Sequence, residues 1–463
     1  MAVVCSSIIA RSCCALALGV LAGGLPACGS DGRPRLPGPD GGAALSGTGG
    51  SSKAGAGGSA GWGGLNAAAG GRAGPTTGGA AVGGSAGRGG DGAGGASGSG
   101  GAGDAGVASG PAMVNPVPGS KPFVGANFWN IGWEGSSNYF ASGVNFASTQ
   151  NPWRPEFLAD LAPYKVLRFM DWNLTNNSDN PQADWDVRTQ KTDNQDKSVA
   201  IEWQIDLCNR AKKDYWITVP HEADPAYWQK LAQLIHDTLD PSLRVYVEWS
   251  NEVWNRQFPQ RGYAQAQGNM LGLSGSDKAA AYYVYASVRL FEAFAAVFGK
   301  DSARLVKVLS GQAARQGPCQ AHVKALSDAK INPNGTKADA YAIAPYLKGN
   351  SIDELEAGIA ELKGWIESNE TCATAAGLPL IAYEGGSDSF SSNDLSVCTT
   401  LQRDPGMQQV YTQLLDAMNA ARLLGPFVHY THSGDCWGLK RRTTDSLASS
   451  PKYKAVVDWF AAH

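Results

Sequence analysis

The sequence predicts an α/β fold, a (β/α)8 TIM barrel, for residues 113–463. Eight short apolar runs recur at fairly regular intervals in this part of the chain, and the segments between them are long enough for helices. Polar side chains gather after these runs rather than before them. Strands that alternate with helices in this way favour a closed barrel of parallel strands, and a doubly wound open sheet is the alternative.

The first 28 residues have the pattern of an export signal. Arg11 is the positive residue, Cys14 to Leu25 is short and apolar, and the segment ends in Leu25-Pro26-Ala27-Cys28. This end resembles a bacterial lipobox, which implies that Cys28 carries lipid and anchors the chain to the outer membrane at the cell surface or its periplasmic face. A plain cleaved signal, with the protein secreted, is the alternative. The apolar run is too short and too rich in glycine for a membrane-spanning helix.

Residues 29–112 consist largely of glycine, alanine and serine. Such a segment buries too little apolar surface to offset the entropy of the chain, so we expect a disordered linker. As a flexible coil of about 84 residues it would reach on the order of 50 Å. No glycine run in it lies between a strand and a helix, so none is interpreted as a phosphate loop.

The expected strands and helices follow in chain order. The apolar runs are Phe123–Trp129, Lys165–Trp172, Tyr215–His221, Arg244–Trp249, Arg304–Ser310, Ala338–Tyr346, Leu380–Glu384 and Phe427–His432. The helical segments are Ser198–Lys212, Pro225–Leu239, Lys278–Phe298, Ile352–Ser368, Met407–Leu424 and a closing Tyr453–Phe460. In Met407–Leu424, apolar residues recur every three or four positions, which indicates one face of an amphipathic helix.

The composition excludes several classes of function. A net charge of −3 and a pI near 6.1 give no reason to expect nucleic acid as a partner. No CxxC motif is present, Pro225 replaces the second histidine of an HExxH motif after His221-Glu222, and a G-x-S-x-G elbow is absent from residues 113–463. We therefore expect no metal ion, no cofactor and no serine nucleophile. The cysteines of the exported part are Cys208, Cys319, Cys372, Cys398 and Cys436; a disulfide among the last three is expected, with its pairing open.

The polar residues after the runs point to one functional end of the barrel. They are Asn127, Asp171, His221, Glu252, Gln312, Tyr346, Glu384 and Trp437. In a (β/α)8 barrel the carboxyl ends of the strands carry the active site, whichever reaction is catalysed. Two of the three carboxylates among them, Glu252 and Glu384, each follow a strongly apolar strand. Such a pair is what a two-carboxylate glycoside hydrolysis site requires.

The two carboxylates carry a family resemblance. Residues 120–463 resemble the retaining (β/α)8 glycoside hydrolases of clan A, most closely the family-5-like glycanases. The motifs are Asn251-Glu252 after strand four, Glu384 after strand seven and Arg168 in strand two, with His221 and Trp437 after strands three and eight. The resemblance implies that Glu252 is the acid/base and Glu384 the nucleophile. The alternatives are a helix-start acid for Glu252 and a turn residue for Glu384.

The resemblance also implies roles for the neighbouring residues. Asn251 would donate to the sugar 2-hydroxyl, Tyr346 would hydrogen-bond the nucleophile, and Trp437 would form the floor of the sugar subsite. His221 would hold a sugar hydroxyl or Glu252. Arg168 is placed to keep Glu384 ionised, and Glu248 is interpreted as a buried structural partner of Arg168. Family 5 usually has a histidine near Tyr346, and Ile343-Ala344-Pro345 has none, which leaves the exact family open.

Further side chains after the strands are candidate sugar contacts. Trp133, Trp172 and Trp254 could stack on successive sugar rings, and Asp171 and Asn127 could hydrogen-bond the sugar. The alternative is that such tryptophans form the core of long loops. The sequence thus predicts a monomeric, endo-glycanase-like retaining hydrolase of a polysaccharide or oligosaccharide. The other hypotheses are a catalytically silent carbohydrate-binding lipoprotein and a non-glycosidase barrel enzyme, such as a metal-free lyase or a transglycosylase.

Overall fold

Eight parallel strands form a closed barrel in the computed structural model, which describes residues 123–128, 139–141, 150–389, 395–423 and 425–463. The strand order around the barrel is β1-β10-β8-β6-β5-β4-β3-β2. The bounds are β1 (Val124–Asn127), β2 (Tyr164–Phe169), β3 (Asp214–Val219), β4 (Val245–Trp249), β5 (Leu305–Ser310), β6 (Ala340–Ile343), β8 (Leu380–Ala382) and β10 (Phe427–His429). The predicted barrel is confirmed, and the open-sheet alternative is wrong because β1 pairs with both β2 and β10.

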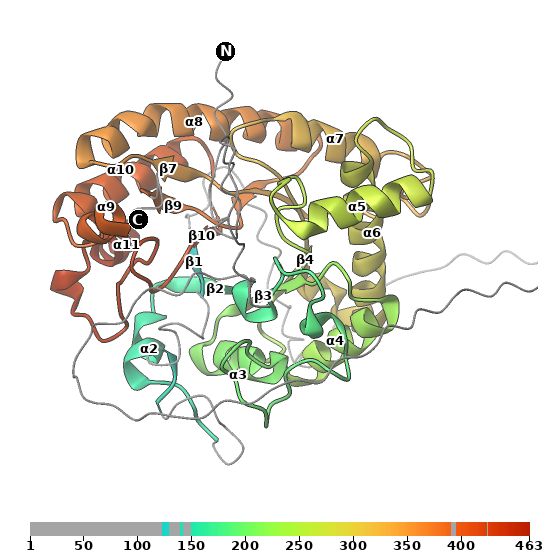
Figure 1. Ribbon diagram of the computed structural model, residues 1–463, viewed down its shortest axis with the longest axis horizontal. Coiled ribbons are helices and arrows are strands. Elements are labelled where there is room, and N and C mark those ends of the chain that lie inside the picture. The colour runs from blue at the N-terminus through green and yellow to red at the C-terminus, as the bar shows by residue number, and fades with distance from the viewer. Residues whose placement is uncertain (1–122, 129–138, 142–149, 390–394, 424) are drawn as a thin grey trace, which may run out of the picture. The chain divides into compact units, whose positions relative to one another are not determined.

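Helices surround the strands (Figure 1). They are α2 (Pro155–Asp160), α3 (Ile201–Ala211), α4 (Pro225–Thr238), α5 (Pro259–Met270), α6 (Lys278–Phe298), α7 (Gly317–Leu326), α8 (Ile352–Ala375), α9 (Leu395–Leu401), α10 (Gly406–Ala420) and α11 (Pro451–Ala462). Every predicted helix is present, and α6 has the expected bounds because Asp277 caps it, accepting a hydrogen bond from the Ala280 amide at 3.0 Å. Helix α8 continues beyond Ser368 because Asn369 and Ala373 are buried in line with Leu362 and Ile366.

A small second sheet extends two barrel strands. Strand β7 (Tyr346–Lys348) follows β6, strand β9 (Gly386–Asp388) follows β8, and the two pair in parallel with Tyr346 opposite Gly386. This sheet lies at the carboxyl end of the barrel strands, because both of its strands continue from them. It therefore holds the residues after β6 and β8 side by side.

The core has an inner and an outer part. Inside the barrel, Trp216 stacks on Tyr246 with ring centroids 5.0 Å apart, and small residues such as Ala340 and Ala342 fill the remaining space. Outside it, aromatic residues pack between strands and helices. Trp172 belongs to this outer core: it is fully buried, with its ring stacked 5.0 Å from Phe128. The predicted sugar contact at Trp172 is therefore wrong.

Two disulfides join helices and loops outside the barrel. Cys398 pairs with Cys436, as expected of the cysteines near the last strands, whereas Cys372 pairs with Cys319. Cys208 is a buried free thiol, and burial raises its pKa. Among the described helices, none is sufficiently long and apolar to cross a membrane.

Candidate active site

The first carboxyl group stands on an unusual turn after β4. The strand Val245–Trp249 is buried along its whole length, and the chain then takes left-handed backbone angles at Ser250 (φ 61°) and Glu252 (φ 44°). Residues other than glycine adopt these backbone angles at a cost on the order of 1 kcal/mol each, and residues with such angles cluster at functional sites. The turn leaves the Glu252 side chain buried, with 1 % of its surface exposed.

The second carboxyl group follows β8 and precedes two glycines. Gly386 has φ 130°, and a Cβ atom at Gly385 would lie only 2.6 Å from the ring of Phe427. Only glycine fits this close approach, so the Glu384-Gly385-Gly386 sequence is required to pass from β8 into β9. Because β9 pairs with β7, the hydroxyl of Tyr346 donates to Glu384 Oε2 at 2.9 Å.

Arg168 on β2 connects the residues of the site. Its side chain is fully buried, and its Nη1 donates to Glu384 Oε1 at 2.8 Å. Nη2 donates to Asn251 Oδ1 at 2.8 Å, and Nε donates to Glu248 Oε2 at 3.0 Å. Burial lowers the pKa of Arg168, but the charges of Glu248 and Glu384 raise it further, so the guanidinium stays charged. Glu248 is the buried partner of Arg168 that the strand pattern suggested.

Glu252 has a different set of partners. Its Oε2 accepts from Asn255 Nδ2 at 3.0 Å, and its Oε1 accepts from the Tyr383 hydroxyl at 3.0 Å. His221 makes no hydrogen bond to it; the imidazole packs edge-on against Tyr263 with ring centroids 5.1 Å apart. Burial lowers the pKa of His221. The expectation that His221 holds Glu252 is wrong, and its role toward a sugar hydroxyl stays a prediction.

Burial raises the pKa of both site carboxyl groups, that of Glu252 to about 7 and that of Glu384 to about 8. The charge of Glu252 also raises the pKa of Glu384. Two groups that repel each other titrate as a pair, so the pair keeps one proton near neutral pH.

The hydrogen-bond partners favour Glu252 as the carrier of this proton. The order of the two pKa values alone would place it on Glu384. However, Glu384 Oε1 lies 2.8 Å from a guanidinium that can only donate, so its charged form is favoured. Glu252 has no cation among its hydrogen-bond partners, and Tyr383 can accept as well as donate. We therefore take Glu384 as the ionised group.

The side-chain amides of Asn251 and Asn127 both form hydrogen bonds to other groups of the protein. Asn251 Nδ2 donates to Asn176 Oδ1 at 3.1 Å, and its Oδ1 accepts from Arg168. Asn127 is fully buried, accepts from Arg168 Nη1 at 3.1 Å and donates to the Tyr383 carbonyl oxygen at 3.1 Å. The amide of Asn127 thus links β1 to β2 and to the end of β8, and its predicted sugar contact stays a prediction.

An aromatic pair lies beside the carboxyl groups. Tyr430, after β10, has its ring 6.5 Å from that of Tyr346 and 6.5 Å from that of Trp437. Its hydroxyl donates to Asp171 Oδ2 at 3.0 Å, so Asp171 is next to the site and its predicted sugar contact stays a prediction. The half-buried Trp437 donates to Asp388 Oδ1 at 3.4 Å.

The half-buried Trp254 also lies at the site, since its indole donates to the Tyr383 hydroxyl at 3.2 Å. The remaining predictions, Trp133 as a sugar contact and Cys28 as the lipidated residue, lie outside the described residues. Tyr383, Asn255 and Tyr430 were missed. Each adjoins a predicted site residue or strand end, but an aromatic or amide side chain there carries no distinct sequence signal.

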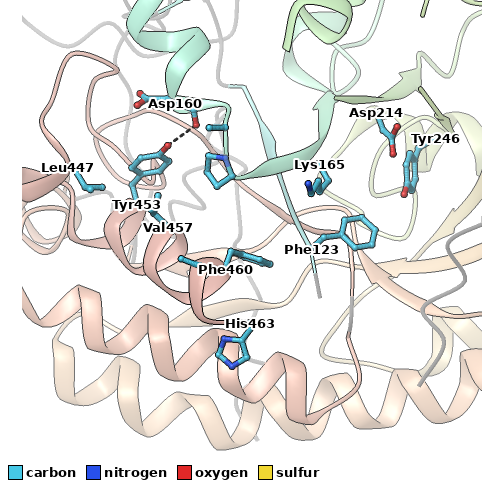
Figure 2. Close-up of a pocket in the computed structure, with 13 residues that line it drawn as sticks. Phe123, Asp160, Lys165, Asp214, Tyr246, Leu447, Tyr453, Val457, Phe460 and His463 are labelled. Atoms are coloured by element: carbon cyan, nitrogen blue, oxygen red, sulfur yellow. Dashed lines mark hydrogen bonds between the residues drawn. The ribbon is translucent and has the colours of Figure 1, made fainter. Parts of the chain in front are cut away.

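Within the described ranges, no group of His, Cys, Asp and Glu is arranged to hold a metal ion. A cavity of about 950 Å³ lies at the other end of the barrel, where Lys165, Asp214 and Tyr246 lie near the beginnings of β2, β3 and β4. Figure 2 shows Phe123 and Phe460 in its wall, and the Tyr453 hydroxyl donating to the Asp160 carbonyl oxygen at 2.8 Å. None of the predicted site residues lines this cavity.

Comparisons with known proteins give matches among solved structures alone. No family model and no curated protein sequence matches the chain. Among solved structures, it is similar to a 4-O-α-L-rhamnosyl-β-D-glucuronidase from Fusarium oxysporum, with 15 % identity, 73 % and 70 % of the two chains covered and a TM-score of 0.44. It is also similar to a family-51 arabinofuranosidase from Xanthomonas axonopodis, with 10 % identity, 68 % and 67 % of the two chains covered and a TM-score of 0.46. A third similar structure is a xylanase from Cellvibrio japonicus, with 11 % identity, 75 % and 72 % of the two chains covered and a TM-score of 0.43.

At these scores the fold assignment depends on the strand order of the chain itself. Fold and site together define a (β/α)8 barrel with two buried carboxyl groups at the carboxyl ends of its fourth and seventh strands.

Proposed function

We propose that the protein is a retaining glycoside hydrolase that cleaves β-glycosidic bonds of a polysaccharide or oligosaccharide in an endo-glycanase-like manner. One observation carries the proposal. Two buried carboxyl groups, which follow β4 and β8, have opposite environments: Glu384 is paired with a guanidinium, and Glu252 is held by an amide and a hydroxyl. An ionised nucleophile next to a protonated acid is what double displacement requires.

The first step forms a covalent intermediate. Glu252 gives its proton to the glycosidic oxygen as the bond to the anomeric carbon breaks, and Glu384 attacks that carbon from the opposite face. In the second step Glu252, now ionised, takes a proton from water, and the resulting nucleophile displaces Glu384. The proton balance closes, since Glu252 is protonated again and Glu384 is released as a carboxylate.

The surrounding contacts fit these roles. Arg168 and Tyr346 both donate to Glu384, and they hold one oxygen each, at 2.8 Å and 2.9 Å. This arrangement fixes the direction of the attacking carboxylate and limits its rotation. The half-buried Trp437 and Trp254 offer aromatic surface on which a sugar ring could stack, and Asn251 and His221 are candidate donors to its hydroxyl groups.

The test is a panel of aryl β-glycosides and β-linked polysaccharides, assayed with the wild type, Glu384→Gln and the control Glu361→Gln. Glu361 is an exposed residue of α8, so its change should leave activity intact. We expect Glu384→Gln to lose several orders of magnitude in rate while still binding sugar. If the wild type cleaves nothing and both proteins bind equally, the protein is a silent carbohydrate binder.

The products distinguish the remaining alternatives. We expect the first product to keep its anomeric configuration, which proton NMR of the early reaction detects. The opposite anomer would require carboxyl groups farther apart, about 6.5–9.5 Å instead of about 5–5.5 Å, with a base role for Glu384. An unsaturated product would identify a lyase, and products longer than the substrate would identify a transglycosylase.

We also propose that the protein is exported, with Cys28 as its lipid anchor. The two disulfides support export, because disulfides persist in oxidising compartments. Metabolic labelling with a palmitate analogue, followed by membrane fractionation, tests this. Cys28→Ser should lose the label and leave the membrane fraction; an unlabelled wild type in the culture medium would favour simple secretion. Light scattering of the purified protein tests the expected monomer.

A further inference from the structure

The Tyr383 hydroxyl has three partners inside the site. It lies 3.0 Å from Glu252 Oε1 and 3.4 Å from the Gly311 carbonyl oxygen, and it accepts a hydrogen bond from Trp254 Nε1 at 3.2 Å. The side chain is fully buried, and the guanidinium carbon of Arg168 lies 5.0 Å from its ring centroid. The hydroxyl is therefore held in place from several sides.

The three partners can satisfy all hydrogen bonds of the Tyr383 hydroxyl in two ways, which differ in the direction of its proton. A hydroxyl has one proton to donate and two lone pairs to accept with. When Glu252 is ionised, the Tyr383 proton points to the carboxylate. When Glu252 is protonated, the acid can donate to Tyr383, whose own proton then turns to the Gly311 carbonyl oxygen. Trp254 donates to the hydroxyl in both arrangements.

We propose that Tyr383 is a positioning residue that holds the Glu252 carboxyl group in both of its protonation states. This inference rests on the proposed function, in which Glu252 loses and regains a proton in every turnover. The hydroxyl changes only the direction of its proton, so the carboxyl group keeps its place while its charge changes.

Tyr346 provides a comparison within the same site. Its hydroxyl has a single hydrogen-bond partner among the described residues, Glu384, at 2.9 Å. A nucleophile that stays ionised between turnovers needs a donor only. Tyr383 has a second acceptor within reach, the Gly311 carbonyl oxygen, whereas the part of the chain that the structure describes offers Tyr346 no second hydrogen-bonded acceptor. Burial raises the pKa of both hydroxyls, so each retains its proton at neutral pH.

The direct test is a titration of Glu252 in the intact protein. Carbon-13 NMR of glutamate labelled at Cδ follows each carboxyl group, and the signal missing from Glu252→Gln identifies Glu252. In Tyr383→Phe we expect the pKa of Glu252 to rise by about one unit. The reason is that Tyr383 bonds the charged carboxylate more strongly than the protonated carboxyl group, so its loss destabilises the charged form more. The control Tyr215→Phe removes an equally buried hydroxyl, bonded to Gln204 at 2.9 Å outside the site, and should leave this pKa unchanged.

Kinetics provide a second measurement. The alkaline limb of the pH profile of kcat/KM should move upward by about one unit in Tyr383→Phe, with kcat about tenfold lower and KM nearly unchanged. A merely structural role would lower the amount of folded protein without moving this limb. If Tyr383→Phe does not fold, Trp254→Phe replaces it, and we expect a smaller shift in the same direction.

The two measurements separate this proposal from the proposed function. A shifted Glu252 titration in a protein that cleaves no glycoside would retain the role of Tyr383 and reject the hydrolase. Cleavage by the wild type, with no shift in either folded variant, would retain the hydrolase and overturn the role of Tyr383.

Discussion

Replacing Arg168 by methionine should destabilise the protein more than any exposed change of charge. Its guanidinium is fully buried between two fully buried carboxyl groups, those of Glu248 and Glu384. Methionine has a similar length but donates no hydrogen bond, so both carboxyl groups lose their counter-charge. Removing one partner of a buried ion pair typically costs about 3–5 kcal/mol. A domain has only about 5–15 kcal/mol of stability in total, so we expect a large loss.

The loss should depend on pH in a defined direction. Without Arg168, the folded-state pKa of Glu384 should lie well above the value of about 4.3 that an unfolded glutamate has, because burial then acts without the counter-charge. The folded variant then binds more protons than its unfolded form between these values, and its stability falls as the pH rises. The difference from the wild type should therefore be larger at pH 7.5 than at pH 5.5, two values chosen about one to three units above the unfolded value.

Urea unfolding followed by circular dichroism measures both effects. The control is Arg210→Met, which removes an arginine that pairs with Asp206 at 2.7 Å. Both side chains are partly exposed, at 37 % and 22 %, so this change should cost only about 1 kcal/mol. A loss below about 1 kcal/mol for Arg168→Met, or the same loss at both pH values, would refute the assignment of Arg168 as the counter-charge of the site.

Four other changes test the structure. Replacing Cys319 and Cys372 by alanine opens a link with a sequence separation of 53 and should lower the free energy of unfolding by about 2–4 kcal/mol, as measured by urea denaturation. Both ring nitrogens of His429 are buried without a hydrogen-bond partner, and burial lowers its pKa to about 3. The folded state therefore binds fewer protons than the unfolded state below about pH 6.5, so the wild type loses stability as the pH falls. His429→Phe should remove up to about 2 kcal/mol of this loss between pH 7.5 and 5.0, as measured by urea denaturation. Equal acid sensitivity of both proteins would contradict this. Trp172→Ala should cost about 3–5 kcal/mol in stability, whereas Trp254→Ala should weaken sugar binding in calorimetry with a much smaller effect on unfolding, and the reverse order would exchange their roles.

The barrel strands could be predicted because parallel strands covered on both faces are continuous apolar runs. The helices that were not predicted have no comparable apolar pattern in their sequence. In α5 the buried residues are Gln260, Ala264 and Gly268, which form no apolar stripe. That helix is recognised only from its packing against α6, a contact the local sequence does not encode.

The site was predictable in its charged residues but only partly in their surroundings. A glutamate at the end of an apolar strand is conspicuous, and both Glu252 and Glu384 lie where the strand pattern placed them. Asn127 and Trp172 occupy equivalent positions in the sequence pattern, yet Asn127 is bonded to Arg168 and Trp172 packs on Phe128 in the outer core. Their burial depends on residues distant in the chain, such as Tyr383, whose carbonyl oxygen accepts from Asn127. No local pattern contains this information.

The left-handed turn after β4 has a consequence for the evolution of this protein. Ser250 and Glu252 both hold backbone angles that glycine would adopt without strain. Laboratory selection for heat tolerance should accept glycine at position 250 and gain on the order of 1 kcal/mol. The same replacement at position 252 would relieve comparable strain and remove the carboxyl group that we propose as the acid/base. Thermal tolerance and turnover should therefore favour different residues at 252, so a variant selected for survival alone can become inactive by a single substitution.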